Sequence, residues 1–598
     1  MNSAIENDEP CLVKAMQGFS VEYKKRLLYS KYAPEKNILH VIENTHIASG
    51  TLVLCVSPVL GLGLDALFAK LPENAVMLGI EADNTLFKFS KQHCIDLECV
   101  KNGAFTFLEP QNLRDFPLHL NSHLSKWRGV FKRVLRIDFS AGSSLHSDFY
   151  NAFYDAVQNS IAQFWKNRIT LVKFGRRYSR NFFQNLQAFA RSISLAQCGS
   201  VEELFGRIEK PLLVLGAGEG LESALSLPKS YLSQCFVLAV DAALPALQSL
   251  GIHIDAVVCE ESQSVIAECF VGATHSATFA ICSLSSCPRA TIKAGKRCLF
   301  YTTLFDDLAF LENARTARIL PPIVPPLGSV GLTAVFLATR FRRDETIPIA
   351  TFGLDFSFSL GKTHARGTVQ HIKRLCMQNK IHPLMNYGAN FCKGAFFTAD
   401  KNNKETTTTV ALSGYARIFK DYFHGVKNLF DGATSGLTLG LELGLPKTNL
   451  ASGGATTYSA YTPHATHMQH APYTAQKEDE LCKTENEDDR ANSANGASIY
   501  SVATAVSATD VASADDTEKA RTIHAYLEAE KNALQNLKDI FLGKIQLSQT
   551  ERNEKIRALF FEREYLFFHF PDGIRPRLEQ DFLNRVRAEL DGFLKIFK

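Results

Sequence analysis

Three glycines between an apolar run and an apparent helix are the first residues in this sequence that could do chemistry. The segment Leu212–Leu221, LLVLGAGEGL, contains Gly216, Gly218 and Gly220. Without side chains, these positions let a phosphate approach the backbone, and the start of a helix offers free N–H groups and the positive end of a dipole. The segment therefore predicts the phosphate-facing loop of a nucleotide-binding α/β domain.

Carboxylates end the next two apolar runs. Asp241 follows the run CFVLAV, and Glu260 and Glu261 follow DAVVC. Acids at such strand ends can hold a ribose hydroxyl or a hydrated Mg²⁺. Asp241 is also suited to cap the helix that follows, and the two roles can coexist.

A second glycine turn lies further along the chain. The segment PPLGSVGLTAVFLA brings Gly328 and Ser329 to the start of another expected helix. This turn is a second candidate for binding an anion or recognising a base.

A histidine between two cations follows the last strong strand of this region. In GLDFSFSLGKTHARGT, Asp355 closes the strand, and Lys362, His364 and Arg366 lie on a glycine-flanked loop. A histidine with a pKa near neutrality is suited to proton transfer near a phosphate. The alternative is a solvated loop histidine without a catalytic role.

These candidates all lie at the ends of apolar runs in the central region, residues 205–445. The runs are continuously apolar rather than alternating, which indicates strands covered on both faces in a mostly parallel sheet. Ligands of such sheets bind beyond the carboxyl ends of the strands. The runs are PLLVLGAG, CFVLAVDA, DAVVCEE, TFAICSL, RCLFYTT and IPIATFGLDFS.

The N-terminal part of the chain, residues 1–165, has the order of half a Rossmann-type domain. A strand-like run at 50–57 is followed by Gly61 and Gly63, and a second run ends in Glu81 and Asp83. The turn is SPVLGLG instead of GxGxxG. We therefore favour a Rossmann-like scaffold domain that has lost its ligand. A functional cofactor site is the alternative.

The remaining segments predict no chemistry of their own. Residues 166–204 are basic and aromatic and predict a helical bridge, most simply a helix pair. Residues 446–515 are rich in small polar residues and predict a disordered linker, whose His464, His467 and His470 lack the fixed geometry of a metal site. Residues 516–598 have apolar side chains at helical spacing and predict a helical C-terminal module.

Composition favours a cytoplasmic globular protein. The 598 residues are 46% hydrophobic and 21% charged, and no apolar run is long enough to span a membrane. The first ten residues, MNSAIENDEP, lack the features of a signal peptide, and the 14 cysteines show no disulfide-like spacing. A net charge of +4 is too small for this length to predict a nucleic-acid partner.

The order of the motifs resembles a known family. GAGEGL, VAVDAALPAL followed by GIHIDAVV, GSV, GLDFS followed by GKTHARGT, and NLFDGATSGL are similar to the central domain of the motility-accessory-factor (Maf) flagellin glycosyltransferases. That domain belongs to a superfamily that includes the 6-hydroxymethylpterin diphosphokinase (MptE)-like proteins. YSKYAPEKN and FGRRYSRNFFQNL also resemble this family, so that the resemblance covers about residues 20–445.

The resemblance implies a glycosyltransferase that moves a nonulosonic acid from its CMP ester to Ser or Thr of flagellin. It implies a CMP-activated sugar as the donor, flagellin as the acceptor, and no certain cofactor, although Mg²⁺ could take part. Carried over to this chain, the resemblance implies that Gly216, Gly218 and Gly220 face the donor phosphate and that Asp241, Glu261 and Ser329 line the nucleotide pocket. It implies that His364 assists departure of the phosphate or deprotonation of the acceptor. Together with the strand-end positions above, this predicts His364, Asp355 and Glu261 as catalytic residues. The predicted nucleotide-binding residues are Gly216, Gly218, Gly220, Asp241, Gly328, Ser329 and Lys362.

The chain departs from the family pattern at three places, and two alternatives stay open. Gly220 replaces a small hydroxyl residue, Cys259-Glu260-Glu261 replaces the Asp-x-Asp pair of the diphosphokinase branch, and DGATSG at residues 431–436 lacks the usual glutamate. One alternative is pyrophosphoryl transfer from ATP to a pterin alcohol. The other is a non-catalytic flagellin assembly factor that retains the fold.

Overall fold

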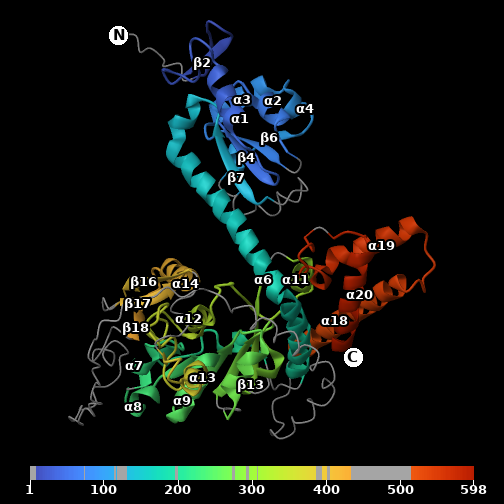
Figure 1. Cartoon of the computed structure of the whole chain (residues 1–598). Coiled ribbons are helices and arrows are strands. Elements are labelled where there is room, and N and C mark those ends of the chain that lie inside the picture. Colours follow the sequence, from blue (N-terminus) through green and yellow to red (C-terminus); the bar gives the residue numbers. More distant parts are fainter. Residues whose placement is uncertain are drawn as a thin grey trace. The chain divides into compact units, whose positions relative to one another are not determined.

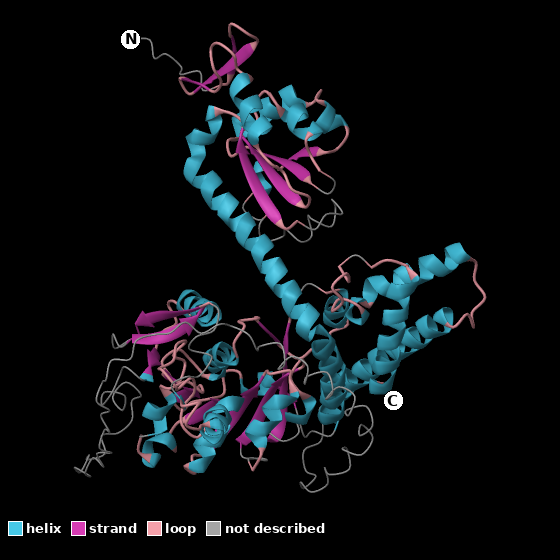
Figure 2. Cartoon of the chain, viewed as in Figure 1, coloured by secondary structure: helices cyan, strands magenta, loops and turns pink. Residues whose placement is uncertain are grey.

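The structure is a computed structural model of an α/β chain with parallel sheets and a helical C-terminal region, which confirms the predicted fold class (Figures 1 and 2). It describes residues 9–72, 75–113, 116, 131–194, 199–225, 227–272, 277–290, 295–305, 308–384, 394–399, 405–432, 514–574 and 576–597. The predicted linker, its histidines and residues 433–436 lie outside these ranges, apart from the last two residues of the linker.

The chain folds as two compact units. The first comprises Met1–Gly175 and Phe568–Ile574, and the second comprises Arg176–Phe567 and Arg575–Lys598. Each unit contains its own parallel sheet. The candidate residues of the central region all belong to the second unit.

The sheet of the first unit has four parallel strands in the order β6-β5-β4-β7. This is the strand order of a Rossmann half, with the first strand in the interior. Strand β4 is buried along its whole length because apolar clusters cover both faces of the sheet. The strands are β4 (Thr51–Val56), β5 (Val76–Ile80), β6 (Phe105–Phe107) and β7 (Arg133–Asp138), and the accompanying helices are α1 (Lys36–Asn44), α2 (Leu64–Ala69), α3 (Asn84–Cys94) and α4 (Glu98–Lys101).

The glycine turn after β4 serves packing. Gly61 and Gly63 have φ angles of +69° and +83°, which glycine adopts at little cost. A Cβ atom at Gly61 would lie 2.5 Å from Leu97, and one at Gly63 would lie 3.0 Å from Ile42. These apolar side chains approach the backbone so closely that glycine is needed at both positions. The two glycines therefore need not follow the GxGxxG spacing of a cofactor loop.

A small N-terminal sheet covers the same turn. Its strands pair antiparallel, and apolar side chains from this sheet form one cluster with Val59 of the turn and Leu86 of α3. The hydroxyl of Tyr29 donates to the Pro58 carbonyl at 2.8 Å and accepts from the Leu60 N–H at 3.2 Å. The strands are β1 (Cys11–Lys14), β2 (Phe19–Tyr23) and β3 (Arg26–Leu27).

A single helix, α6, replaces the helix pair that we expected for residues 166–204. It runs over 48 residues, Ser147–Ser194, and so begins well before the predicted bridge. The segment contains no proline, and its only interior glycine, Gly175, faces a side chain that needs the space: a Cβ there would lie 2.3 Å from the Phe568 ring. Nothing in the sequence therefore interrupts the helix.

Within the described ranges, the sheet of the second unit has nine strands, and each of the six predicted runs forms one of them. Its order is β14-β13-β12-β11-β10-β9-β15-β18, with β8 paired to β13, and all neighbours are parallel. The strands are β8 (Gly199–Ser200), β9 (Leu212–Leu215), β10 (Phe236–Val240), β11 (Ile254–Cys259), β12 (Ala277–Ser283), β13 (Gly295–Thr303), β14 (Ile323–Val324), β15 (Ile349–Phe352) and β18 (Leu429–Asp431).

The strand order reverses at β9. Strands β10 to β14 add on one side of β9, and β15 and β18 add on the other. Connections that leave the sheet in opposite directions make this point the usual ligand site of an open parallel sheet. Helix α12 (Val330–Phe341) packs on β9, β10, β11 and β15 and so lies beside this point.

The C-terminal helices form a module with its own buried polar network. Arg563 donates to Glu530 at 2.9 Å, and the hydroxyl of Tyr565 also donates to Glu530. Phe183 of α6 packs edge-on against Tyr565 and Phe593. The helices are α18 (Ala514–Phe541), α19 (Gln549–Glu562) and α20 (Gln580–Ile596).

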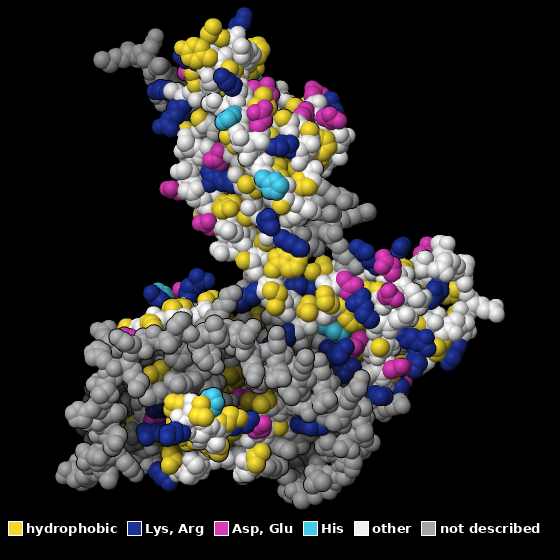
Figure 3. Space-filling view, in the orientation of Figure 1, with side chains coloured by type: hydrophobic (Ala, Val, Ile, Leu, Met, Phe, Trp, Pro, Cys, Tyr) yellow, Lys and Arg dark blue, Asp and Glu magenta, His cyan; other side chains and the backbone are white. Residues whose placement is uncertain are grey.

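The outer faces of these helices carry mixed charges. Basic and acidic side chains are intermixed with other side chains over the face that Figure 3 shows. Among the described residues, no helix has the length and apolar character needed to cross a bilayer.

A buried carboxyl group in the first unit makes the stability of this unit depend on pH. Glu81 is 0% exposed at the end of β5 and accepts a hydrogen bond from the Tyr150 hydroxyl at 2.8 Å. Burial raises its pKa to about 8. The folded state therefore holds a proton that the unfolded chain releases near its ordinary pKa of 4.5.

We predict that Glu81→Gln removes this pH dependence. Below pH 4.5 both the folded and the unfolded chain hold this proton, so that Glu81 does not lower the free energy of unfolding. As the pH rises from 4.5 towards 8, only the folded chain holds it, and the free energy of unfolding falls by up to about 1.4 kcal/mol per pH unit. Urea midpoints measured from pH 5 to 8 should fall less steeply for Glu81→Gln than for the wild type, while Glu43→Gln at an exposed position should follow the wild type. Parallel curves for all three proteins would contradict the prediction.

Candidate functional site

The predicted glycine loop, Gly216–Gly220, packs against the segment that follows β15. Gly216 donates its N–H to the last residue of β15, and Gly218 and Gly220 donate theirs to that segment. The bonds run from Gly216 to the Phe352 carbonyl at 2.7 Å, from Gly218 to the Gly353 carbonyl at 3.0 Å, and from Gly220 to Asp355 Oδ2 at 2.9 Å.

Lack of space explains why these positions are glycines. A Cβ at Gly216 would lie 2.3 Å from the Gly353 carbonyl oxygen, and one at Gly218 or Gly220 would lie 2.2 or 2.5 Å from the Asp355 carboxylate. The glycines thus allow two strand-end loops to touch. The N–H groups that we expected to face a phosphate have acceptors within the protein, and the following helix α7 (Leu221–Leu225) has only five residues.

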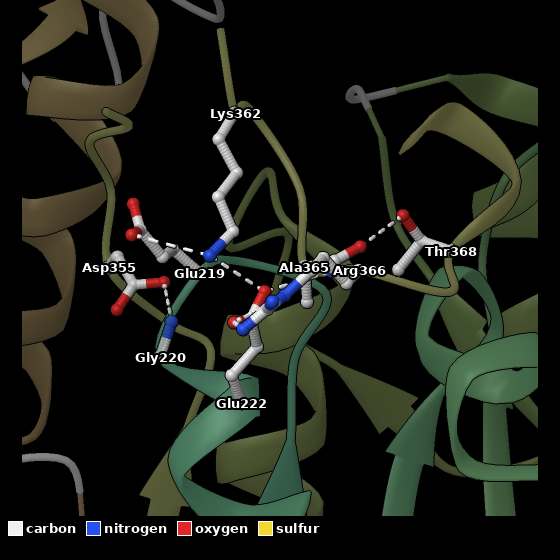
Figure 4. A network of polar contacts seen from close by, with 8 residues as sticks. All are labelled: Glu219, Gly220, Glu222, Asp355, Lys362, Ala365, Arg366 and Thr368. Atoms are coloured by element: carbon white, nitrogen blue, oxygen red, sulfur yellow. Dashed lines mark hydrogen bonds and ion pairs between the residues drawn. The ribbon is translucent and has the colours of Figure 1, made fainter. Parts of the chain in front are cut away.

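Two cations of the predicted histidine loop lie beside the glycine loop in an ion-pair network (Figure 4). Lys362 Nζ lies 2.7 Å from Glu222 and 3.4 Å from Glu219, and Arg366 Nη2 lies 2.7 Å from Glu222. Burial raises the pKa of Glu222, but hydrogen bonds from Arg366 and Lys362 outweigh it and lower this pKa to about 2. Glu219 and Glu222 therefore neutralise cations that the sequence suggested for phosphate.

His364 is neutral at physiological pH. Burial lowers its pKa to about 4, with a smaller contribution from the charges of Arg374 and His371. Its Nδ1 lies 2.9 Å from the Thr363 hydroxyl. His364 can therefore accept a proton or a hydrogen bond, whereas the imidazolium form needed to donate a proton is scarce.

Glu260 joins three elements of the second unit. The Thr303 hydroxyl at the end of β13 donates to its Oε1 at 3.2 Å, and the Thr333 hydroxyl in the first turn of α12 donates to its Oε2 at 2.9 Å. Burial raises the pKa of Glu260, the two threonine hydroxyls lower it in part, and the nearby charge of Glu261 raises it further. The backbone N–H of Gln263 donates to Glu261 Oε1 at 2.8 Å.

Two tyrosines from distant parts of the chain lie near Glu260. Burial and the charges of Glu261 and Glu260 raise the pKa of Tyr178, in α6, to about 12. Burial and Glu260 raise the pKa of Tyr415, in α14 (Val410–Tyr422). We call these residues the Glu260 cluster: Tyr178, Glu260, Glu261, Thr303, Thr333 and Tyr415.

Sequence reasoning missed the tyrosines and the threonines of this cluster. They are spread over α6, β13, α12 and α14. Tyr178 lies in the segment FGRRYSRNFFQNL, Thr303 ends the run RCLFYTT and Thr333 follows the turn at Ser329, but nothing in these segments singled the three residues out. Gly328 itself lies against Tyr415, because a Cβ there would be 3.0 Å from the ring.

Asp241 and Tyr301 bring two unpaired polar atoms next to the Glu260 cluster. Asp241 is 2% exposed, and burial with the charges of Glu261 and Glu260 raises its pKa to about 7. Its Oδ1 accepts the N–H of the next residue, Ala242, at 2.8 Å. Asp241 is not the N-cap that we expected, because the helical turn begins at Asp241 itself and the N-cap of the following α-helix is Ala243. The Oδ2 of Asp241 and the hydroxyl of the fully buried Tyr301 have no partner among the described residues.

The structure thus gathers the predicted residues into two neighbouring groups. Gly216, Gly218, Gly220, Asp355 and Lys362 form one, and Asp241 and Glu261 lie in the other. The first turn of α12 touches both, because Thr333 bonds Glu260 and a Cβ at Gly331 would lie 2.4 Å from Leu354. The ranges described contain no group of three His, Cys, Asp or Glu side chains placed to hold a metal ion.

We predict that Gly216→Ala destabilises the second unit by about 1–3 kcal/mol, the usual cost of overpacking a filled space. The new methyl group would meet the Gly353 carbonyl and Leu354. Gly414→Ala in α14 is the matched control: no atom lies near its added Cβ, and alanine favours a helix by about 0.5–1 kcal/mol. Equal urea midpoints for the two variants would contradict the proposed contact between the loops.

Comparisons with known proteins support the centre of the chain as a defined domain. Residues 180–361 match the model of the 6-hydroxymethylpterin diphosphokinase MptE-like family, which confirms the predicted MptE-like domain. A solved structure of a MAf glycosyltransferase from Magnetospirillum magneticum AMB-1 is similar with a TM-score of 0.49 and 11% identity, over 99% of this chain and 92% of that one.

A curated relative matches almost end to end. It is a Treponema pallidum (strain Nichols) protein described as uncharacterized, and it is 30% identical over 590 residues, which cover 98% of this chain and 95% of the relative. The chain therefore belongs to the same family as this Treponema pallidum protein, and it carries an MptE-like domain at its centre.

Proposed function

We propose that the chain is a Maf-like glycosyltransferase that moves a nonulosonic acid from a CMP ester to Ser or Thr hydroxyls of flagellin. The order of the motifs along the MptE-like domain supports the family part of this proposal. The observation that carries the chemical part is the convergence of the Glu260 cluster, the glycine loop and the first turn of α12 at the carboxyl edge of one parallel sheet.

The Glu260 cluster has the side chains that a nucleoside needs. Tyr178 and Tyr415 offer aromatic faces, and Glu260, Glu261, Thr303 and Thr333 offer oxygen atoms for hydroxyl and amino groups. Both oxygens of Glu260 accept threonine hydroxyls, so a Mg²⁺ ion would have to compete with these bonds. The proposed transfer assigns no step to a metal.

His364 is the base of the proposed reaction. In this reaction the acceptor hydroxyl oxygen forms a bond to the anomeric carbon, the bond from that carbon to the phosphate oxygen breaks, and CMP leaves with the electron pair. Neutral His364 takes the proton of the acceptor hydroxyl, a role that its lowered pKa of about 4 permits across the physiological range. Asp355 acts as a positioning residue through its bond to Gly220.

A second candidate function is diphosphokinase activity, because the matching family is described by it. That reaction consumes ATP and a pterin alcohol with Mg²⁺. Calorimetry with the full-length protein separates the two candidates: CMP binding without ATP binding supports the transferase, and Mg²⁺-dependent ATP consumption in the presence of the pterin alcohol supports the diphosphokinase.

We predict that His364→Ala lowers sugar transfer to flagellin by about 10²–10⁴-fold, the usual contribution of a general base. The measurement is the intact mass of flagellin from cells that produce the variant. His382→Gln, at an exposed position further along the chain, should leave the flagellin mass of the wild type.

Two results would count against this proposal. Full glycosylation by a folded His364→Ala variant would remove His364 from the mechanism. An unchanged flagellin mass in a strain that lacks the whole protein would contradict the transferase and favour the non-catalytic assembly factor.

A further inference from the structure

We infer that strand β16 of the second unit is a docking edge to which an extended segment of the acceptor polypeptide adds as a further strand. This inference rests on the proposed function, since that function makes a polypeptide with Ser or Thr hydroxyls the second substrate. It concerns a part of the unit to which the motifs assign no role. This part is the antiparallel pair of β16 (Ala395–Ala399) and β17 (Glu405–Thr409), which lies beside α14 (Figure 1).

The two strands of this pair differ in burial. The threonines at residues 406–408 of β17 are buried, whereas Phe396 and Phe397 of β16 are 45% and 71% exposed. The Thr408 hydroxyl donates to the Phe356 carbonyl at 2.8 Å. Strand β17 therefore fixes the pair to the segment that follows β15, and β16 is the outer strand.

The bonds of Thr407 decide which backbone groups of β16 face outwards. Its N–H donates to the Phe358 carbonyl at 2.9 Å and its carbonyl accepts the Phe358 N–H at 2.8 Å, so both groups point away from β16. Phe397 stands opposite Thr407 in the pair. Because bonded and non-bonded positions alternate along an antiparallel pair, the N–H and carbonyl groups of Ala395, Phe397 and Ala399 point to the outer edge. Among the described residues, these groups have no hydrogen-bond partner.

An edge of this kind is matched by an extended backbone. Outward N–H and carbonyl groups are the groups to which a further strand bonds, and an exposed phenylalanine gives its side chains an apolar contact. Proteins usually protect such an edge with a charged residue, a proline or a bulge. Strand β16, with the sequence AFFTA, has no charged residue and no proline. It is therefore open to pairing with another chain.

The size of the edge favours a transient partner over a second copy of this chain. Strand β16 has five residues, so one added strand buries well under the roughly 1,200–2,000 Å² of a stable interface. A substrate has to bind and leave, which suits a contact of this size. The edge is also tied to the proposed base through the chain: His364 lies six residues after Phe358, so their Cα atoms are at most about 22 Å apart.

The decisive variant is Ala399→Pro in the full-length chain. The measurement is its affinity for unmodified flagellin, purified from a strain that lacks the protein. Proline removes the outward N–H and leaves the bonds between β16 and β17 intact, because an edge strand tolerates proline where its N–H faces away from the sheet. We expect flagellin to bind about tenfold more weakly.

Ala399→Val is the matched control. Valine keeps the outward N–H and suits a strand, so this variant should bind flagellin as the wild type does. Thermal melts of the two variants verify that both are folded. Equal flagellin affinity for Ala399→Pro and Ala399→Val would overturn the inference, as would the absence of flagellin binding to the wild type.

Phe397→Glu tests the apolar contact. The side chain is largely exposed, so the fold should tolerate the change, while flagellin should bind about ten- to a hundredfold more weakly because the contact is lost. Phe561→Glu, at a phenylalanine of α19 that is 80% exposed, should bind flagellin as the wild type does. A similar loss in both variants would show an effect of charge alone and remove the contact from β16.

Failure of this inference can be told apart from failure of the proposed function. Weaker binding by the β16 variants, with an unchanged flagellin mass in the deletion strain, would leave the docking edge standing and refute the transferase. Wild-type binding by these variants, with a changed mass in the deletion strain, would refute the docking edge alone. Wild-type dimers in sedimentation that dissociate in Ala399→Pro would assign the edge to a second copy and so refute the acceptor as its occupant.

Discussion

The contact between the loops after β9 and β15 is the constraint on which the rest of the second unit depends. The two strands are neighbours at the point where the sheet reverses its order, and their loops approach so closely that only glycines fit. The N–H groups of the three glycines donate to Phe352, Gly353 and Asp355, and the backbone of the histidine loop donates to Glu222. The first turn of α12 lies beside the Glu260 cluster, because Thr333 in this turn donates to Glu260.

The fold could be predicted from the sequence because its strands are buried on both faces. A run such as LLVL or FVLAV, short and continuously apolar, favours an interior parallel strand, and the residues that end each run then mark the carboxyl edge. Helix α6 was harder to predict, since a helix of 48 residues and a pair of shorter helices have the same periodicity.

The site could be predicted only in part. Asp241, Glu261 and the turn at Ser329 were found because strand ends and helix starts have local signals. Tyr178 and Tyr415 lie on helices that are far apart in sequence, and their partner Glu260 depends on hydroxyls from two further elements. The charges of the site could not be predicted from the sequence for the same reason. The pKa of His364 is lowered by burial, and the glutamates that pair with Lys362 are distant from it in sequence.

Helix α6 also limits how this protein can have evolved. Gly175 belongs to the first unit and Tyr178, one turn later, belongs to the second, so the boundary between the units lies inside a continuous helix. A gene rearrangement that exchanged either unit would have to cut this helix beside Tyr178 of the Glu260 cluster, whereas most domains are exchanged at loops. The two units are therefore expected to be inherited together, in keeping with a relative that aligns over 95% of its length.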